Sequence, residues 1–277
     1  MHMGTTVTLP GGALVGDRLA REAAFHAFTG RLEEQLAELV DSAHGPRPAR
    51  VSALLACVLA HIGGEPATPE RVASLGFTDR QFLMLAFALE HREDDQWRHV
   101  ACVRCGAAFD VGFRLSGLPV SPAGAGYPWA QSTVAGKSLR LRVPTGEDEE
   151  RIAGLAPLTA RRALALACIA SIGGAPPAPV ELDAFGDADI EAIDAALDAV
   201  APQLATTLST ACTECGAAHT LELDAYDMAA PVPQQLYCDV HALALRYHWS
   251  EDQILQLPRE RRRLYLDLID QASGVNY

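Results

Sequence analysis

The sequence predicts an α+β protein in which a tandem duplication of one strand–helices–cysteine knuckle–strand module is joined at a zinc-ribbon-like site. Three observations lead to this prediction. Two Cys-x-x-Cys pairs recur 110 positions apart, from Cys102 to Cys212, other short blocks recur in the same order, and each pair follows a helical pattern and has strand-like flanks. Repetition at a fixed spacing indicates an internal duplication. A C-terminal helical appendage lies outside the repeated part.

The most specific repeat surrounds the cysteines. Residues 101–110 read ACVRCGAAFD and residues 211–220 read ACTECGAAHT. The glycine after each pair allows the tight knuckle turn in which backbone amides approach a sulfur. One pair leaves a zinc ion half coordinated, whereas two pairs supply the four thiolates of a closed tetrahedral site. We therefore predict one structural zinc per chain, bound by four ligands: Cys102, Cys105, Cys212 and Cys215.

Two further blocks define the modules. FHAFTGRLEEQLA (25–37) and LRVPTGEDEERIA (141–153) both contain an extended segment, Thr-Gly, acidic residues and a helical pattern, and AHIGG (60–64) matches ASIGG (170–174). The predicted parts are an N-terminal extended segment (1–21), module 1 (22–117), a Pro-, Gly- and Ala-rich linker (118–137), module 2 (138–225) and a C-terminal helical segment (226–277).

Strands are expected near 7–10, in the N-terminal segment, and near 22–28, at the start of module 1. Thr29 can cap the helix that follows, with Glu33 and Glu34 near its positive end. The other expected elements are a helix over about 50–61 that stops at Gly63-Gly64, a helix from Thr78 or Asp79 to about Glu90, and a strand–knuckle–strand segment over about 97–115.

Module 2 repeats this plan. A strand is expected over 139–143, and Thr145 with Asp148 resembles a capping box. Helices are expected near 158–171 and 187–200, and strands flank the second cysteine pair.

The C-terminal segment carries an apolar stripe and the only dense basic cluster, at 259–263. Aromatic and arginine anchors suit a helix-in-groove contact with an acidic partner surface. In the alternatives, the arginines form a solvated helix face and the apolar residues pack back on the protein itself. The predicted partner-binding residues are Leu236, Val240, Leu243, Tyr247, Trp249, Arg259, Arg262 and Arg263.

Charge and composition argue against some classes of function. The 22 basic and 35 acidic residues give a formal net charge of −13, which repels nucleic acid phosphates and anionic membranes. The longest apolar runs, 53–60 and 163–170, are shorter than the roughly 20 residues of a membrane span. Seven cysteines without a secretion signal fit reduced thiols and metal. We expect a cytoplasmic protein with no membrane partner and no small-molecule substrate.

Other candidate residues have simpler interpretations. His99 and His219 lie near the knuckles and could replace a thiolate if the modules held separate ions, although a surface or supporting role is the default. Cys57, Cys168 and Cys238 lie in apolar helical settings that favour core packing. The sequence contains no nucleophile elbow and no zincin motif, so it offers no positive sign of an active site.

Several sequence blocks together resemble those of one known family: TLPGG (8–12), AFTGRLEEQLA (27–37), DRQFLMLAF (79–87) before CVRCG, RVPTG (142–146) and DVHALALRYHWSEDQILQLPRERRRLYLDLI (239–269). Through these blocks, over about 8–270, the chain resembles the baseplate (hub assembly chaperone) protein family of T4-type contractile phage tails, which has relatives in contractile injection systems. Val103 and Thr213 stand where family knuckles often have proline, which leaves the ligands unchanged.

The resemblance implies a structural or assembly role in a baseplate, with no reaction catalysed and with other baseplate or tail proteins as partners. The site of action would be the bacterial host cytoplasm during assembly, and retention in the finished particle stays open. Two alternatives remain at this stage. One is a zinc-ribbon regulatory or nucleic-acid-binding module, and the other, less favoured, is a metal-dependent hydrolase.

Overall fold

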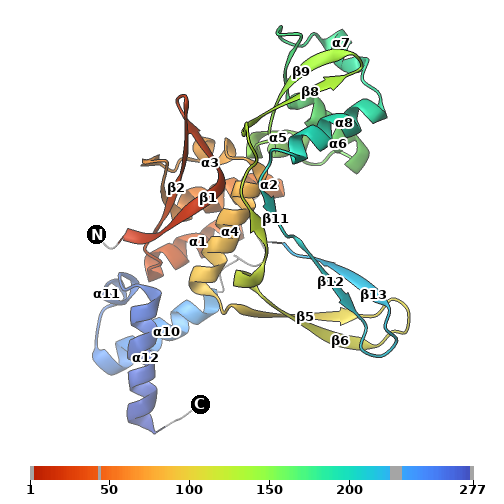
Figure 1. The fold of residues 1–277 in the computed structure, drawn as a ribbon. Coiled ribbons are helices and arrows are strands. Elements are labelled where there is room, and N and C mark those ends of the chain that lie inside the picture. Colours follow the sequence, from red (N-terminus) through yellow and green to blue (C-terminus); the bar gives the residue numbers. More distant parts are fainter. Residues whose placement is uncertain (1–2, 43–44, 225–232, 275–277) are drawn as a thin grey trace.

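The protein has a mixed architecture of 44% helix and 30% strand with small antiparallel sheets. The structure is a computed structural model that describes residues 3–42, 45–224 and 233–274. Figure 1 shows a body from which two long hairpins extend side by side, with the C-terminal helices at one end of the molecule and residues 129–198 at the other. Within the described residues, no helix combines the length and the apolar character needed to cross a membrane.

The first half of the chain builds a four-stranded antiparallel sheet in the order β1-β2-β3-β4, covered by four helices. A β5–β6 hairpin follows this layer. The elements are β1 (Met3–Val15), β2 (Arg18–His26), α1 (Gly30–Ser42), α2 (Arg47–Val58), β3 (Leu59–Ile62), β4 (Glu65–Pro66), α3 (Pro69–Ala73), α4 (Phe77–His91), β5 (Asp95–Ala101) and β6 (Ala108–Arg114).

The second half follows a similar order around a three-stranded sheet, β10-β9-β8. A short turn η1 (Leu115–Gly117) and β7 (Val120–Ser121) connect the halves, and β7 pairs with β11. The remaining elements are β8 (Trp129–Val134), β9 (Lys137–Arg142), α5 (Gly146–Ile152), α6 (Pro157–Ala167), β10 (Ile169–Ile172), α7 (Pro179–Asp183), α8 (Asp187–Asp198), β11 (Gln203–Leu204), β12 (Thr207–Ala211) and β13 (Ala218–Glu222). Strand β8 lies within the segment that composition predicts as linker.

Each half has its own apolar core. The larger core gathers side chains from β1 to α4, including Phe25 and Phe87, and also takes Leu223 from the end of β13. The smaller core packs α6 and α8 on the β8–β10 sheet through residues such as Leu141 and Ile193. Because both sheets are small, the helices supply much of the buried apolar surface that holds each half together.

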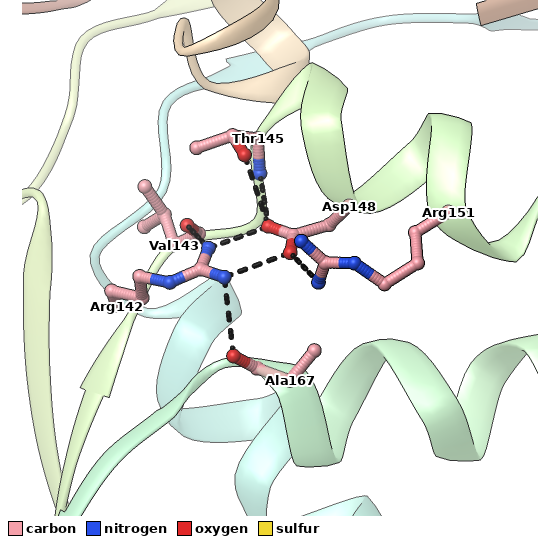
Figure 2. A network of polar contacts seen from close by, with 6 residues as sticks. All are labelled: Arg142, Val143, Thr145, Asp148, Arg151 and Ala167. Carbon is pink, nitrogen blue, oxygen red and sulfur yellow. Dashed lines mark hydrogen bonds and ion pairs between the residues drawn. The ribbon is translucent and has the colours of Figure 1, made fainter.

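The start of α5 is fixed by a buried carboxylate. Asp148 has no exposed surface and accepts hydrogen bonds from the backbone N–H and the hydroxyl of Thr145, at 2.9 and 3.0 Å. Arg142 at the end of β9 donates to the same carboxylate at 2.7 Å, and Arg151 donates at 3.0 Å (Figure 2). Burial alone raises the pKa of Asp148, but the hydrogen bonds from Arg142 and Thr145 hold it below its usual value. The predicted cap between Thr145 and Asp148 is therefore confirmed.

Two predicted helices end earlier than expected. The helix predicted over 50–61 is α2 followed by β3, and the helix predicted over 158–171 is α6 followed by β10. Strand β3 pairs with β2, and β10 pairs with β9. A short apolar run has the same composition in a buried helix and in a buried strand, so pairing with a distant strand decides between them.

Within the described residues 233–274, the C-terminal segment forms three helices: α10 (Pro233–Tyr247), α11 (Glu251–Leu255) and α12 (Arg259–Ser273). Ser250 caps α11 by accepting the N–H of Gln253 at 3.3 Å. Helices α10 and α11 pack against α1, so the segment belongs to the body of the protein rather than hanging free (Figure 1).

Candidate metal centre

The two cysteine pairs lie in the turns of the two hairpins. Strands β5 and β6 pair from Asp95↔Arg114 to Ala101↔Ala108, and β12 and β13 pair from Thr207↔Glu222 to Ala211↔Ala218. Each hairpin therefore closes directly on a Cys-x-x-Cys-Gly turn. The hairpins run side by side, so the turns meet at their tips (Figure 1).

The two turns have the same backbone geometry. Cys102 donates its N–H to the carbonyl of Ala107 at 2.8 Å, and Cys212 donates to Ala217 at 2.9 Å. Gly106 and Gly216 have φ angles of 75° and 68°, the left-handed region that favours glycine. This conformation turns the chain tightly enough for both sulfurs of a pair to face the same point.

The four sulfurs form a compact cluster. All four Sγ atoms lie within 4.8 Å of one another. Two of the separations cross between the hairpins: 3.7 Å from Cys102 to Cys215 and 3.7 Å from Cys105 to Cys212. A tetrahedral ion with bonds of about 2.3 Å to sulfur would separate its ligands by about 3.8 Å. The cluster can therefore hold one metal ion shared by both hairpins.

Backbone donors favour the thiolate form of one cysteine, Cys102. The backbone N–H of Cys105 is the main cause that lowers the pKa of the Cys102 thiol to about 5. Arg104 donates its N–H to the same sulfur at 3.4 Å, and Nε2 of His219 lies 3.3 Å from it. Because a metal binds the thiolate and not the thiol, these donors prepare the sulfur for ligation.

A small apolar cluster supports the sulfurs. Cys102, Phe109 and Cys212 are buried together, with Val100, Ala107, Val111, Cys215 and Ala217 packed around them. The ring of Phe109 also contacts His219, with centroids 5.5 Å apart. These few side chains join one hairpin to the other. Four protein ligands would fill a tetrahedral coordination sphere and leave no position for a substrate, which is the arrangement of structural sites.

The two histidines near the knuckles take different positions. His99 lies directly across the β5–β6 ladder from Asp110, and its Nδ1 is 2.9 Å from a carboxylate oxygen on an exposed face. His219 instead lies beside a sulfur and within donor distance of it. His99 is thus remote from the cluster, whereas His219 has the supporting position that was the default expectation.

The remaining cysteines lie apart from the cluster. Cys168 is fully buried in the smaller core, and burial raises the pKa of its thiol to about 12. Cys57 is half-buried against the larger core. Cys238 is exposed, which differs from the expected core position, because helix α10 presents its neighbours Leu236 and Asp239 to the protein instead.

The predicted partner-binding residues of the C-terminal segment divide into two groups. Leu236, Leu243 and Arg262 are buried against the protein itself, at 2%, 0% and 0% exposure, so they are covered in the single chain and cannot contact a partner on its surface. This is the self-packing alternative. The other predicted residues reach the surface at least in part: Val240, Tyr247, Trp249, Arg259 and Arg263.

The accessible residues include an aromatic cluster. Tyr247 stacks on Trp249 with centroids 4.9 Å apart, and Tyr265 contacts the edges of both rings. Arg259 lies over the ring of Phe28 at 5.8 Å, and Arg263 is exposed. A partner role for these accessible residues remains a prediction.

Comparison with known proteins yields no relative for this chain, because no family model, no curated protein and no solved structure matches it.

Proposed function

We propose that this chain is a non-enzymatic structural or assembly protein of the baseplate of a contractile phage tail or a phage-like injection system. The observation that carries the structural part is the closed set of four sulfurs shared between two hairpins. A full tetrahedral sphere fastens segments together and leaves no site for chemistry. The sequence blocks that resemble the baseplate family support the assignment to a tail.

The proposed resident ion is zinc, one per chain. Four thiolates in a tetrahedral arrangement favour zinc or iron over the hard cations magnesium and calcium, which take oxygen ligands. The identity is testable by elemental analysis of the purified protein, where we expect a zinc-to-chain ratio near one. A ratio near two would contradict a shared site, and iron in place of zinc would contradict the assignment of the metal.

We further propose that the two halves derive from a duplicated module joined at a zinc-ribbon-like site. The shared order of elements supports this proposal: a strand, two helices, a short strand, two helices and a cysteine hairpin occur in both halves. The two knuckles also make equivalent hydrogen bonds from Cys102 and from Cys212. The proposed partners are other baseplate or tail proteins, met in the bacterial cytoplasm during assembly.

Deletion of the gene in the genome that encodes this chain tests the function. Loss of a baseplate component or assembly factor is expected to leave tail tubes or sheaths without baseplates in electron micrographs. Complementation with the wild-type gene should restore complete tails, and the Cys212→Ser gene should restore far fewer. Complete tails in the deletion strain, or a genome without tail genes around this one, would refute the proposal.

A further inference from the structure

Module 1 and module 2 meet at a second place, far from the cysteines, which we name the inter-module joint. Residues 75–80 at the start of α4 lie against residues 145–149 at the start of α5. Gly76 and Thr145 form an isolated antiparallel bridge. Phe77 donates its N–H to Pro144 at 3.3 Å, and Gly146 donates to the carbonyl of Leu75 at 3.1 Å.

A buried arginine fills the centre of the inter-module joint. Arg80 is 2% exposed, and its Nε lies 3.5 Å from a carboxylate oxygen of Glu149. It also donates to the hydroxyl of Ser52 at 2.8 Å. A Cβ added to Gly146 would lie 1.9 Å from the guanidinium, so only glycine permits this approach.

The C-terminal helices attach to module 1 by the same set of contacts, which we name the C-terminal joint. Here 257–262 lies against 29–33. Pro258 and Thr29 form an isolated antiparallel bridge. Arg259 donates its N–H to Phe28 at 2.9 Å, and Gly30 donates to the carbonyl of Leu257 at 3.4 Å.

The C-terminal joint also has a buried arginine at its centre. Arg262 has no exposed surface and forms an ion pair with Glu33. A Cβ added to Gly30 would lie 3.0 Å from the Arg262 guanidinium, so glycine again allows the close approach. In both joints, one side has the sequence Thr-Gly-x-x-Glu at the start of a helix, and we name it the acceptor because its glutamate lies next to the arginine. The other side has the sequence Leu-x-x-x-x-Arg, and we name it the donor because it supplies that arginine.

The match between the two donors extends beyond the contact itself. Helix α3 (69–73) corresponds to α11 (251–255), and α4 (77–91) corresponds to α12 (259–273), always with an offset of 182 residues. Thr68 and Ser250 cap the short helices at the same relative position, each accepting an N–H from the residue three positions later. The acceptors are likewise related by one constant offset, 116 residues.

The order of donor and acceptor along the chain differs between the joints. In the inter-module joint the donor comes before the acceptor in the sequence, and in the C-terminal joint it comes long after it. The contact therefore does not depend on how the two sides are connected. Surfaces that recognise each other regardless of connection can also meet when they belong to separate chains.

We propose that the start of α1, defined by Thr29, Gly30 and Glu33, is a docking site for the helices α10–α12 and that a second copy of this chain can supply them. Two copies would then exchange their C-terminal segments and form a symmetric dimer. Each docking site is filled in the dimer by the same contacts that fill it in the single chain. This inference does not rest on the proposed baseplate function.

Two charge-reversed full-length variants test the exchange. Glu33→Arg and Arg262→Glu each place like charges inside the joint of a single chain. When the variants are mixed, an exchanged heterodimer restores opposite charges in both joints. Native mass spectrometry should therefore show about tenfold or more heterodimer in the mixture than dimer in either variant alone, since losing one partner of a buried pair is costly. The double variant Glu33→Arg/Arg262→Glu should behave like the wild type.

A second measurement covers the case in which charge reversal prevents folding. Arg31 and Asp252 form an exposed ion pair at the edge of the C-terminal joint. A tagged Arg31→Cys chain is mixed with an untagged Asp252→Cys chain, so a disulfide between positions 31 and 252 can form only between copies. Recovery of this cross-link, absent when either variant is oxidised alone, supports exchange. The proposal would be overturned if neither the heterodimer nor the cross-link formed.

Discussion

Two of the contacts between modules 1 and 2 differ in almost every physical respect. At the hairpin tips, which we name the knuckle joint, a few apolar side chains surround four sulfurs on slender two-stranded ribbons. At the inter-module joint, a buried arginine lies between packed helices beside the larger core. An isolated hairpin is marginally stable in water, so the tips cannot hold each other by burial alone.

The two joints are stabilised by different interactions. The knuckle joint has little apolar surface to remove from water, and a metal with four ligands can replace that missing stabilisation. The inter-module joint has enough packing to hold, but its buried charge must keep a matching partner. One joint should therefore respond to metal and the other to single charge changes.

The largest expected effect is a loss of metal that is confined to the knuckle joint. Cys212→Ser removes one of four ligands, and structural zinc sites contribute on the order of 10 kcal/mol of binding free energy. We expect the metal-to-chain ratio to fall from near one to near zero, with the helix content in circular dichroism retained because both module cores lie elsewhere. The matched control is Cys238→Ser, since Cys238 is exposed and outside the cluster. A variant that keeps its metal would disprove the four-ligand site.

The second prediction addresses the inter-module joint. Arg80→Met keeps the length of the side chain but removes the charge and the donors to Ser52 and to the carbonyl of Pro48. Breaking a buried charged contact costs about 3–5 kcal/mol, which urea unfolding would measure as a lower free energy of unfolding. The metal content should not change.

Arg161→Met is the control for this prediction. Arg161 also pairs with a carboxylate, that of Asp194, but its side chain is 49% exposed. Exposed pairs contribute about 1 kcal/mol or less. Equal losses in the two variants would show that burial does not determine the cost at Arg80.

The two joints also differ in how far the sequence predicts them. The sequence predicts that the two cysteine pairs meet. The spacing within each pair, the glycine after it and the number of thiols are all visible in short stretches of sequence. The cap formed by Thr145 and Asp148 could also be predicted, since a capping box spans only four residues. The cluster of four cysteines and the cap could therefore be predicted without coordinates.

The arginine joints could not be predicted in this way. Arg262 lies in a run of arginines that is typical of a solvated face, yet it is buried because Glu33, 229 positions away, compensates its charge. Arg80 follows Asp79 at the start of a helix, where charges are usually exposed. The buried face of α10 could not be predicted for the same reason. Leu236 and Leu243 are buried because α10 packs on α1, which is distant in the sequence. Local patterns do not contain such long-range pairings.

The third prediction uses pH to separate the joints. Burial, helped by Glu150 and Asp148, raises the pKa of Glu149 to about 7 despite the nearby Arg80. The folded protein then binds a proton more tightly than the unfolded chain, so this contribution is full below about pH 4.5 and is lost as the pH rises towards 7. It amounts to at most about 3 kcal/mol.

Metal-free protein and its Glu149→Gln variant, unfolded in urea between pH 4.5 and 7.5, isolate this contribution. The wild type should lose stability relative to the variant as the pH rises. In metal-loaded protein, the contribution of the knuckle joint should instead fall as the pH falls, because protons compete with the metal for the thiolates. Parallel pH profiles of the two proteins would contradict the raised pKa.

The smallest expected effect refines the knuckle joint itself. His219→Phe keeps an aromatic ring against Phe109 but removes the nitrogen that lies 3.3 Å from the sulfur of Cys102. Loss of a supporting hydrogen bond typically weakens metal affinity by about 10–100-fold, so a competing chelator should remove the metal at lower concentration while the ratio stays near one. His99→Phe is the control and should leave affinity unchanged, since His99 pairs with Asp110 on an exposed face. If His219→Phe instead lost the metal as completely as Cys212→Ser, His219 would be a ligand, and the shared four-sulfur site would have to be redrawn around a histidine.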